Sequence, residues 1–449
     1  MHSLEQLHRG ELAGITRLDL ACDLTEFPEA IFSLADTLEI LNLSGNQLSS
    51  LPADLPRLHK LRVLFCSDNN FTEVPAVLGQ CPQLEMVGFK ANQIRHLPAA
   101  ALPAKLRWLI LTDNQLEQLP EELGQCPRLQ KLMLAGNRLR ELPASLANCH
   151  NLELLRIAAN QLDALPQWLL QMPRLSWLAY AGNPFCDRLE AASLRQHPLR
   201  AIAWSQLCLS ARLGEGASGV IQQATWQPEQ GPAQQIAVKL FKGAVTSDGL
   251  PHSEMSACIA AGQHANLIGL LGQLSEHPQA TPGLLLELIE PSFRPLAGPP
   301  SLNSCTRDCY AEDECFSLPN VLRIAHGMAA AAAHLHAQGI NHGDLYGHNI
   351  LRNDVGSCLL GDFGAASFTD LSNPSEAQAL QRLEVRAFAC LLEELLERCP
   401  LTGAQGESDQ PLWALQRACA STDNRSRPLF AEIAALLQHA LDLAETHGA

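Results

Sequence analysis

The residues best suited to chemistry are carboxylates, an amide and a lysine in the C-terminal half of the chain. Asp344 and Asn349 occur in the run HGDLYGHN, Asp362 begins a DFG triplet, and Lys239 ends the apolar run IAVK. Asp344 could accept the proton of a hydroxyl, whereas Asn349 and Asp362 offer the hard oxygen ligands that Mg²⁺ prefers. Such a set suits phosphoryl transfer, which depends on alignment and charge neutralisation.

A glycine-rich segment precedes these residues and would position a phosphate chain. In LGEGASGVI, Gly214, Gly216 and Gly219 follow the G-x-G-x-x-G pattern. That pattern alone also occurs in dinucleotide-binding folds. Here the surrounding residues predict strand–turn–strand, and a buried strand that ends in Lys239 comes next. We therefore expect the glycines to cover phosphates rather than to begin a helix.

Taken in order, these motifs resemble the protein-kinase family over residues ~205–440, and in particular its tyrosine-kinase-like and bacterial eukaryotic-like Ser/Thr members. The resemblance implies an ATP- and Mg²⁺-dependent enzyme whose catalytic residues are Asp344, Lys239, Glu254 and Asn349. It makes Asn349 and Asp362 the metal ligands and Leu286 the gatekeeper, with the Glu287 and Ile289 backbones on adenine. The implied ATP-binding residues are Leu213, Gly214, Gly216, Gly219, Ile221, Ala237, Lys239, Leu286, Glu287, Ile289, Leu351 and Asp362.

Three features depart from that family. Gly343 replaces the arginine that senses a phosphorylated activation loop, so we expect control by the N-terminal half instead. Tyr346 replaces the lysine of Ser/Thr kinases. The segment between Gly364 and Glu384 is short and lacks an APE motif, so the peptide-docking side is reduced.

Two alternatives stay open. The run HGDLYGHN also resembles aminoglycoside and choline phosphotransferases, which favours a small-molecule acceptor. An ATP-binding pseudokinase or scaffold is the other alternative. The glycine loop, the IAVK strand and the DFG triplet favour a protein kinase, most simply one specific for Ser/Thr.

The N-terminal half is a repeat. The pattern L-x-x-L-x-L-x-x-N-x-L recurs about every 23 residues from Leu38 to Leu175. It resembles the leucine-rich-repeat family over residues ~12–186, in which stacked units share one core. The predicted fold is an α/β leucine-rich-repeat solenoid with a C-terminal cap (residues 1–203), followed by a bilobal α+β protein-kinase domain (residues 204–449).

The concave face of the solenoid carries an unusually apolar stripe. The strand positions that should point outward include large side chains that would normally avoid water. We expect them to dock a protein partner, a protein substrate or the kinase half of this chain. The predicted partner-binding residues are Phe65, Met86, Trp108, Ile110, Met133, Arg156 and Trp177.

Charge and composition restrict the kinds of partner and the cellular location that we expect. The formal net charge of −16 argues against nucleic acid as a partner. The sequence has no apolar run long enough to span a bilayer and no signal-peptide core. Fifteen scattered cysteines favour a reducing, cytoplasmic location. Cys305, Cys309 and Cys315 do not follow a standard zinc spacing, and we expect free thiols on an exposed loop.

Overall fold

The structure, a computed structural model, describes residues 2–196, 199–216, 218–243, 245–400 and 410–447. The chain divides into two compact units, Met1–Arg174 and Leu175–Ala449. Residues 175–196 and 199–203, which we expected to belong to the repeat domain, therefore pack with the C-terminal unit. In the part of the chain that is described, no helix is long and apolar enough to cross a membrane.

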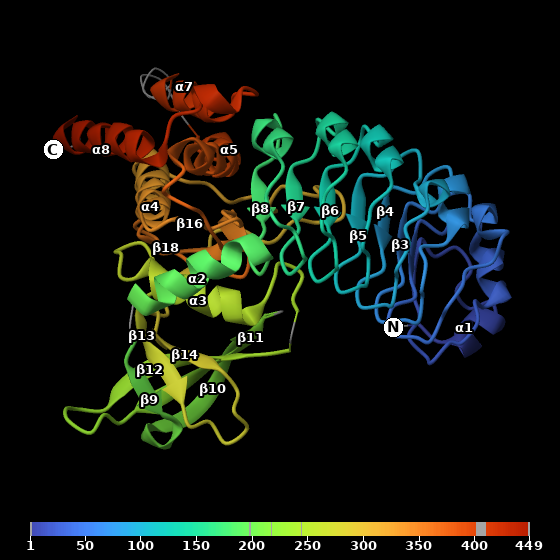
Figure 1. Cartoon of the computed structure of the whole chain (residues 1–449), viewed down its shortest axis with the longest axis horizontal. Helices are drawn as coiled ribbons and strands as arrows, with labels where there is room; N and C mark the ends of the chain where they lie inside the picture. The colour runs from blue at the N-terminus through green and yellow to red at the C-terminus, as the bar shows by residue number, and fades with distance from the viewer. Residues whose placement is uncertain (1, 197–198, 217, 244, 401–409, 448–449) are drawn as a thin grey trace. The chain divides into compact units, whose positions relative to one another are not determined.

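The first unit is a leucine-rich-repeat solenoid, in which each repeat pairs a short parallel strand with a 3-10 helix (Figure 1). Neighbouring strands pair in register, so that Ile40 lies opposite Val63 and Val63 opposite Met86. Proline forms the N-cap of most of the 3-10 helices, where its fixed φ suits the bend. The elements are α1 (Leu4–His8), β1 (Arg17–Asp19), η1 (Glu29–Leu34), β2 (Ile40–Asn42), η2 (Leu55–Arg57), β3 (Val63–Phe65), η3 (Ala76–Gln80), β4 (Met86–Gly88), η4 (Ala99–Ala101), β5 (Trp108–Ile110), η5 (Glu121–Gln125), β6 (Lys131–Met133), η6 (Ala144–Asn148), β7 (Leu154–Arg156) and η7 (Gln167–Gln171).

A leucine core and a row of asparagines stabilise the solenoid. Leu41 and Leu109 point inward and are buried. Asn114 is 7% exposed; its amide donates to the carbonyls of Phe89 and Leu111 at 2.9 and 3.1 Å, and its Oδ1 accepts from the Ile94 N–H. The side chain therefore satisfies backbone groups of three turns that would otherwise lie buried without partners.

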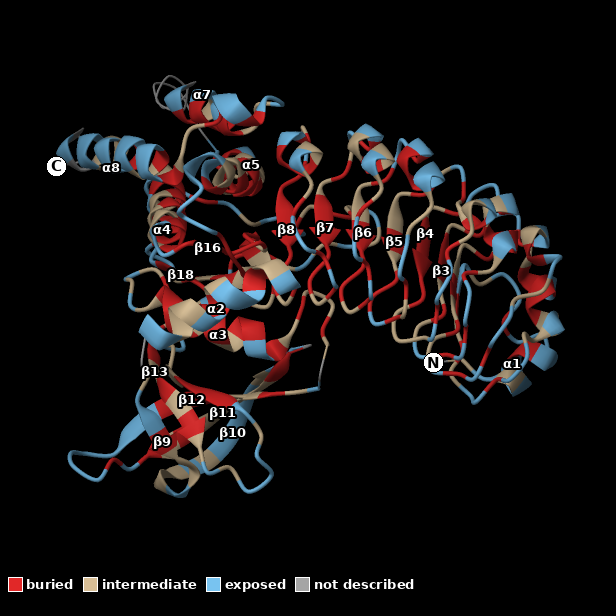
Figure 2. Cartoon of the chain, in the orientation of Figure 1, coloured by how far each residue is buried: buried red, intermediate tan, exposed pale blue. Residues whose placement is uncertain are grey.

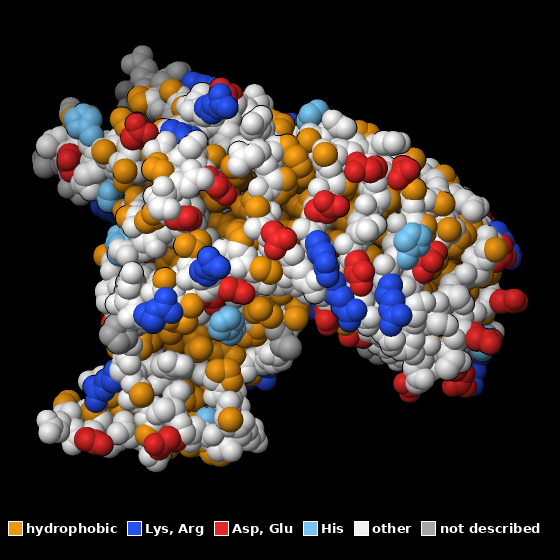
Figure 3. Space-filling model, viewed as in Figure 1, with side chains coloured by type: hydrophobic (Ala, Val, Ile, Leu, Met, Phe, Trp, Pro, Cys, Tyr) orange, Lys and Arg blue, Asp and Glu red, His pale blue; other side chains and the backbone are white. Residues whose placement is uncertain are grey.

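The outer surface of the solenoid is charged. Figure 3 shows acidic and basic side chains mixed on one face of the repeats. Arg62 lies 3.5 Å from a carboxylate oxygen of Glu39 and 3.3 Å from one of Glu85. Exposed pairs of this kind add little stability, so the leucine core and the asparagines carry most of the stability of the solenoid.

The second unit begins with the last repeat strand, β8 (Trp177–Ala179), and the cap helix α2 (Pro184–Gln196), and continues into a six-stranded sheet. Four of the strands form an antiparallel run with order β10-β11-β12-β14, and β13 and β9 complete that edge. Helices α2 and α3 lie side by side next to the sheet (Figure 1). The bounds are β9 (Ala201–Ala203), η8 (Trp204–Gln206), β10 (Leu207–Glu215), β11 (Gly219–Trp226), β12 (Gln234–Phe241), α3 (Pro251–Ala261), β13 (Leu270–Ser275) and β14 (Gly283–Glu287).

The rest of the second unit is mainly helical. Its buried residues gather on α4, α5 and β16 (Figure 2). Helix α4 is rich in alanine, a strong helix former, and begins at an N-cap, Ser317, whose side chain accepts from the Asn320 N–H. The elements are β15 (Arg294–Pro295), α4 (Leu318–Ala337), β16 (Ile340–Asn341), η9 (Gly347–Asn349), β17 (Ile350–Arg352), β18 (Cys358–Leu360), β19 (Ser367–Phe368), α5 (Pro374–Glu397), α7 (Gln410–Cys419), η10 (Asn424–Ser426) and α8 (Phe430–His447).

Candidate active site

The glycine-rich segment forms a hairpin between β10 and β11. Gly214 pairs with Ile221, and the Gly216 N–H donates to the Gly219 carbonyl at 2.9 Å. A Cβ at Gly216 would meet nothing within 4 Å, whereas one at Gly219 would lie 2.5 Å from the Leu240 carbonyl oxygen. The chain thus runs strand–turn–strand as predicted, and Gly219 is needed for close contact with β12.

Lys239 lies on β12, opposite Ile221 on one side and Leu284 on the other. Its ammonium forms an ion pair with Glu254 on α3, and the Glu254 side chain is 2% exposed. Burial alone would lower the pKa of Lys239, but the carboxylates of Glu254 and Asp362 outweigh it and raise the pKa. Lys239 therefore stays charged in a site shielded from water.

The HGDLYGHN run places two polar side chains next to each other after β16. Asn349 donates from Nδ2 to Asp344 Oδ2 at 2.7 Å and to the Asp344 carbonyl at 2.9 Å. Both side chains are half-buried, whereas Asp362 is exposed and its Oδ1 accepts from the Gly364 N–H at 3.1 Å. Asp362 has a positive φ of 52°, a strained conformation often found at functional sites.

A carboxylate on α5 supports the backbone before Asp344. Glu384 is 3% exposed and accepts hydrogen bonds from the His342 and Gly343 N–H groups at 3.3 and 2.7 Å. His336 Nε2 lies 2.7 Å from the same carboxylate. Two buried backbone donors are thereby satisfied, and the turn that presents Asp344 is fixed to the helical core.

The oxygen donors suit a Mg²⁺ ion bound together with nucleotide phosphates. Because the Asn349 amide nitrogen is directed to Asp344, its carbonyl oxygen and the Asp362 carboxylate are the donors available for a hard cation. Within the residues described, no group of three or more His, Cys, Asp or Glu side chains could form a metal cage. Mg²⁺ commonly takes one or two protein ligands and completes its shell with phosphate and water, so Asn349 and Asp362 are the residues that could hold it.

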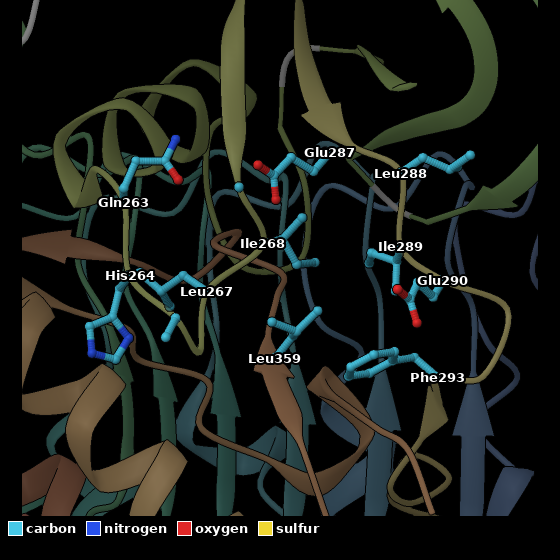
Figure 4. Close-up of a pocket in the computed structure, with 12 residues that line it drawn as sticks. Gln263, His264, Leu267, Ile268, Glu287, Leu288, Ile289, Glu290, Phe293 and Leu359 are labelled. Atoms are coloured by element: carbon cyan, nitrogen blue, oxygen red, sulfur yellow. The ribbon is translucent and has the colours of Figure 1, made fainter. Parts of the chain in front are cut away.

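Two cavities flank the segment from Leu286 to Ile289, which we predicted to contact adenine. A small one, of about 80 Å³, lies behind Leu286 and is lined by Lys239, Glu254 and Asp362 among others. A larger one, of about 600 Å³, lies against the segment after β14, where Ile268, Ile289, Phe293 and Leu359 form an apolar wall beside Glu287 (Figure 4). Neither Lys239 nor the glycines of the β10–β11 hairpin line the larger cavity. Because Lys239 carries the positive charge that phosphates need, we assign the phosphate site to the space in front of Lys239.

The comparisons with known proteins agree with this geometry. The family model described as "Protein tyrosine and serine/threonine kinase" matches residues 207–398. This segment is a protein kinase domain. Leucine-rich-repeat models match residues 37–58 and 127–185 of the solenoid.

The kinase relatives are distant. The proto-oncogene serine/threonine-protein kinase mos of Sus scrofa is 27% identical over 176 residues, which cover 37% of this chain and 49% of the relative. The serine/threonine-protein kinase mos of Gallus gallus gives the same identity and coverage over 178 residues. Human leucine-rich repeat-containing protein 7 is 35% identical over 78 residues, 17% of this chain and 5% of the relative. The chain thus spans about half the length of the mos kinases that it matches.

The other residues predicted to bind ATP lie around the kinase sheet. Ala237 is buried on β12, and Ile221, Leu286, Ile289 and Leu351 are half-buried. Leu213 and Glu287 are exposed. Of these residues, Ile221 and Leu286 line the small cavity that also contains Lys239 and Asp362.

The predicted partner-binding residues differ in exposure. Phe65, Trp108 and Ile110 are half-buried, whereas Met86, Met133, Arg156 and Trp177 are buried. The Phe65 and Trp108 rings meet edge to face at 6.5 Å, and Gly88 leaves room for the Phe65 ring. The expected water-facing stripe is therefore correct only for part of the set, and Trp177 is enclosed within the kinase unit.

The segment before α4 that carries Cys305, Cys309 and Cys315 is only in part the exposed loop that we expected. Cys309 and Cys315 are exposed free thiols, but Cys305 is buried, which corrects the expectation of an exposed loop. The insert instead provides Asp308, which accepts from the His348 N–H at 3.1 Å and lies 2.7 Å from His348 Nδ1. The sequence alone did not predict this contact, since no local motif links residues forty positions apart.

Proposed function

We propose that the chain is an ATP- and Mg²⁺-dependent protein kinase that phosphorylates serine or threonine hydroxyls. The main support is the joint presence of the Lys239–Glu254 ion pair and the Asp344–Asn349 hydrogen bond, with Asp362 close enough to influence Lys239. The match to kinases described as serine/threonine-specific supports the choice of acceptor.

In this proposal each residue of the site has a defined role. Asp344 accepts the proton of the attacking hydroxyl, and Asn349 keeps the Asp344 carboxylate oriented. Lys239, held by Glu254, offsets phosphate charge. Asn349 and Asp362 would hold Mg²⁺, which supplies further neutralisation of phosphate oxygens when bound. The glycine hairpin would cover the phosphates with backbone N–H groups.

A small-molecule phosphotransferase is the second candidate, and the shortened segment after Asp362 favours it. Only residues 369–373 join β19 to α5, in the region that protein kinases use to dock a peptide. An ATP-binding scaffold with negligible turnover is the third candidate, although Asp344, Lys239, Glu254 and Asn349 are all present.

Tracking the γ-phosphate decides among these. The full chain with Mg·ATP and a mixed protein extract should yield phosphoprotein, whereas Asp344→Asn and Asp362→Ala should lose it. Asp354→Asn, which changes an exposed carboxylate outside the site, is the matched control. ATP consumption without phosphoprotein would support a small-molecule acceptor. Nucleotide binding without any consumption would overturn the enzyme proposal.

We further propose that the solenoid binds the substrate or a regulator through Phe65, Trp108 and Ile110. The edge-to-face Phe65–Trp108 pair, with the Lys131 ammonium 4.2 Å from the Trp108 ring centroid, gives a half-buried aromatic surface suited to a protein contact. Phe65→Glu and Trp108→Glu should abolish capture of partner or change kinase output. Leu436→Glu, on an exposed site of α8, is the control. Unchanged capture and output would refute the docking role.

A cytoplasmic location is part of the same proposal. All fifteen cysteines are free thiols, and Cys66 and Cys149 are fully buried in the solenoid. Proteins of oxidising compartments usually pair their cysteines, so the free thiols favour a reducing compartment. Fractionation of cells that produce the tagged chain would test this.

A further inference from the structure

Part of the second unit occupies an unexpected place beside the kinase active site. The last repeat strand β8 and the cap helix α2 lie within the same compact unit as α3 and the catalytic loop, which we define as residues 342–349. Strand β8 contacts α5, and α2 contacts both α3 and β19. Only residues 369–373 connect β19 to α5. The segment after the DFG triplet is therefore too short to support both the loop that carries Asp344 and helix α3.

Trp177 on β8 holds the catalytic loop. Its indole N–H donates to the Leu345 carbonyl at 3.1 Å, and its ring stacks on Tyr346 with centroids 4.2 Å apart and planes 6° from parallel. Both aromatic side chains are almost fully buried. Trp177 therefore contacts the two residues that directly follow Asp344, by one hydrogen bond and one ring face.

The backbone of the same strand continues the contact. The Leu178 carbonyl oxygen would lie 2.7 Å from a Cβ at Gly343, so this approach needs glycine. The Tyr180 N–H donates to Ser367 Oγ at 2.9 Å, and the Tyr180 hydroxyl lies 2.8 Å from Thr369 Oγ1. Strand β8 and Tyr180, the residue that directly follows it, thus contact both the residue before Asp344 and the residues after the DFG triplet.

Glu190 on the cap helix holds α3. Its carboxylate is 3% exposed; Ser253 Oγ donates to it at 3.2 Å, and His252 Nε2 lies 2.9 Å away. Ser253 directly precedes Glu254, the partner of Lys239. Leu194, one turn further along α2, packs on the apolar cluster that contains Ile259 of α3. A buried carboxylate at the N-terminus of a helix is also favoured by the helix dipole.

We infer that Leu175–Gln196 acts as a built-in activation element: Trp177 positions the catalytic loop, and Glu190 positions α3 so that Glu254 meets Lys239. Neither residue lines the cavity that contains Lys239, Glu254 and Asp362, so we treat both as positioning residues. The inference rests on the proposed phosphotransfer, and it explains how the domain can hold an aligned site without an arginine at Gly343 and without a phosphorylated loop.

A double-mutant cycle on nucleotide affinity tests the Glu190 arm without need of turnover. With the full chain and Mg²⁺, Glu190→Gln should weaken binding of a non-hydrolysable ATP analogue about tenfold, because charge-assisted bonds to α3 are lost. In a Lys239→Ala background the same change should have little further effect, since both act through one ion pair. Glu229→Gln, an exposed carboxylate in the β11–β12 loop, is the control. An equal loss of affinity in both backgrounds, or none in either, would refute the Glu190 arm.

The proposed role of Trp177 in positioning the catalytic loop is tested by measuring kcat and KM separately. Trp177→Phe keeps a ring against Tyr346 but loses the N–H donor, and Trp177→Ala loses both. We expect kcat to fall by a few-fold and by about 30-fold respectively, with nucleotide affinity unchanged, since misplacing a catalytic group slows chemistry more than binding. Trp413→Phe, half-buried on α7, is the control. Equal loss of kcat and nucleotide affinity would indicate only a structural role and refute this arm.

A second variant and a hydrogen-exchange measurement test the role of Glu190 even if Glu190→Gln does not fold. If Glu190→Gln does not fold, Ser253→Ala removes the same hydrogen bond at smaller cost and should reproduce the affinity loss. Hydrogen exchange in α3 should be faster in either folded variant than in the wild type, and unchanged exchange would count against the inference. A wild-type chain without turnover would refute the proposed function, whereas the affinity cycle and the exchange rates would still decide the positioning role of Glu190.

Discussion

The Gly343 N–H donates to Glu384 Oε1 at 2.7 Å, which ties the turn before Asp344 directly to helix α5. The Glu384 carboxylate also accepts from the His342 N–H and lies beside His336 Nε2. The catalytic turn is therefore anchored from its helical side by one buried carboxylate.

Removal of the Glu384 carboxylate should destabilise the second unit. Glu384→Ala leaves the buried N–H groups of His342 and Gly343 without acceptors, and we expect a loss of about 2–4 kcal/mol in the free energy of unfolding. Denaturant titration measures this. Glu397→Ala, at the exposed end of the same helix, should change stability by less than about 0.5 kcal/mol. Similar effects of the two changes would contradict the anchoring role.

The same carboxylate predicts a dependence of stability on acid pH. Burial alone would raise the pKa of Glu384, but the hydrogen bond from His336, the nearby His342 and the Gly343 N–H hold its pKa below the usual range. Since the folded pKa is lower than the unfolded value of about 4.3, this stabilisation is complete above pH ~4.3 and is lost as the pH falls through the folded pKa. Unfolding titrations of the wild type and Glu384→Gln should therefore differ most above pH ~4.3 and converge in stronger acid. A constant difference down to the lowest pH would contradict this assignment.

Gly343 should tolerate no side chain. Its φ is +72°, and a Cβ would lie 2.5 Å from the Ala365 carbonyl oxygen. We expect Gly343→Ala to cost about 2–5 kcal/mol of stability from backbone strain and overpacking together. Gly243→Ala is the control, because Gly243 also has a positive φ but a Cβ there would meet nothing within 4 Å. Equal costs would mean that strain alone, and not the approach of neighbouring backbone, requires Gly343.

The buried asparagine row of the solenoid should contribute more to the free energy of unfolding than exposed asparagines nearby. Asn114→Ala removes one acceptor and the donors to several buried carbonyls, and we expect a loss of about 2–4 kcal/mol. Urea unfolding followed by a probe in the first unit measures this. Asn70→Ala, whose side chain is exposed and makes one long hydrogen bond, should cost far less. A comparable cost at both positions would argue against the role of the row.

Withdrawal of divalent metal should abolish phosphotransfer while leaving the fold intact. With excess EDTA, we expect no γ-phosphate transfer and no change in the unfolding temperature of the nucleotide-free chain, because Asn349 and Asp362 are fixed by protein hydrogen bonds. Asp362→Ala should remove most of the Mg²⁺ dependence of nucleotide affinity, which calorimetry measures. Full transfer in EDTA would contradict the assignment of both ligands.

Local patterns predicted the fold and most of the candidate site. The repeat of leucine and asparagine indicated the solenoid, because each residue type answers a need within its own repeat or the next. Lys239, Asp344 and Asp362 could be placed because each lies in a short motif. The contacts of Trp177 with Tyr346 and of Asp308 with His348 could not, since they join residues 169 and 40 positions apart that share no pattern. The residue types at positions 343 and 346 could be read from the sequence, but their contacts with Leu178 and Trp177 of β8 could not.

The close fit of strand β8 and helix α2 to the kinase domain has a practical consequence for dissecting the chain. The repeat model ends at residue 185 and the kinase model begins at 207, which invites a cut between them. A fragment that starts there would uncover the Tyr346 ring and leave Ser253 and His252 of α3 without their carboxylate partner. The smallest autonomous kinase piece should instead begin near Leu175, so one repeat strand belongs to the enzyme as much as to the solenoid.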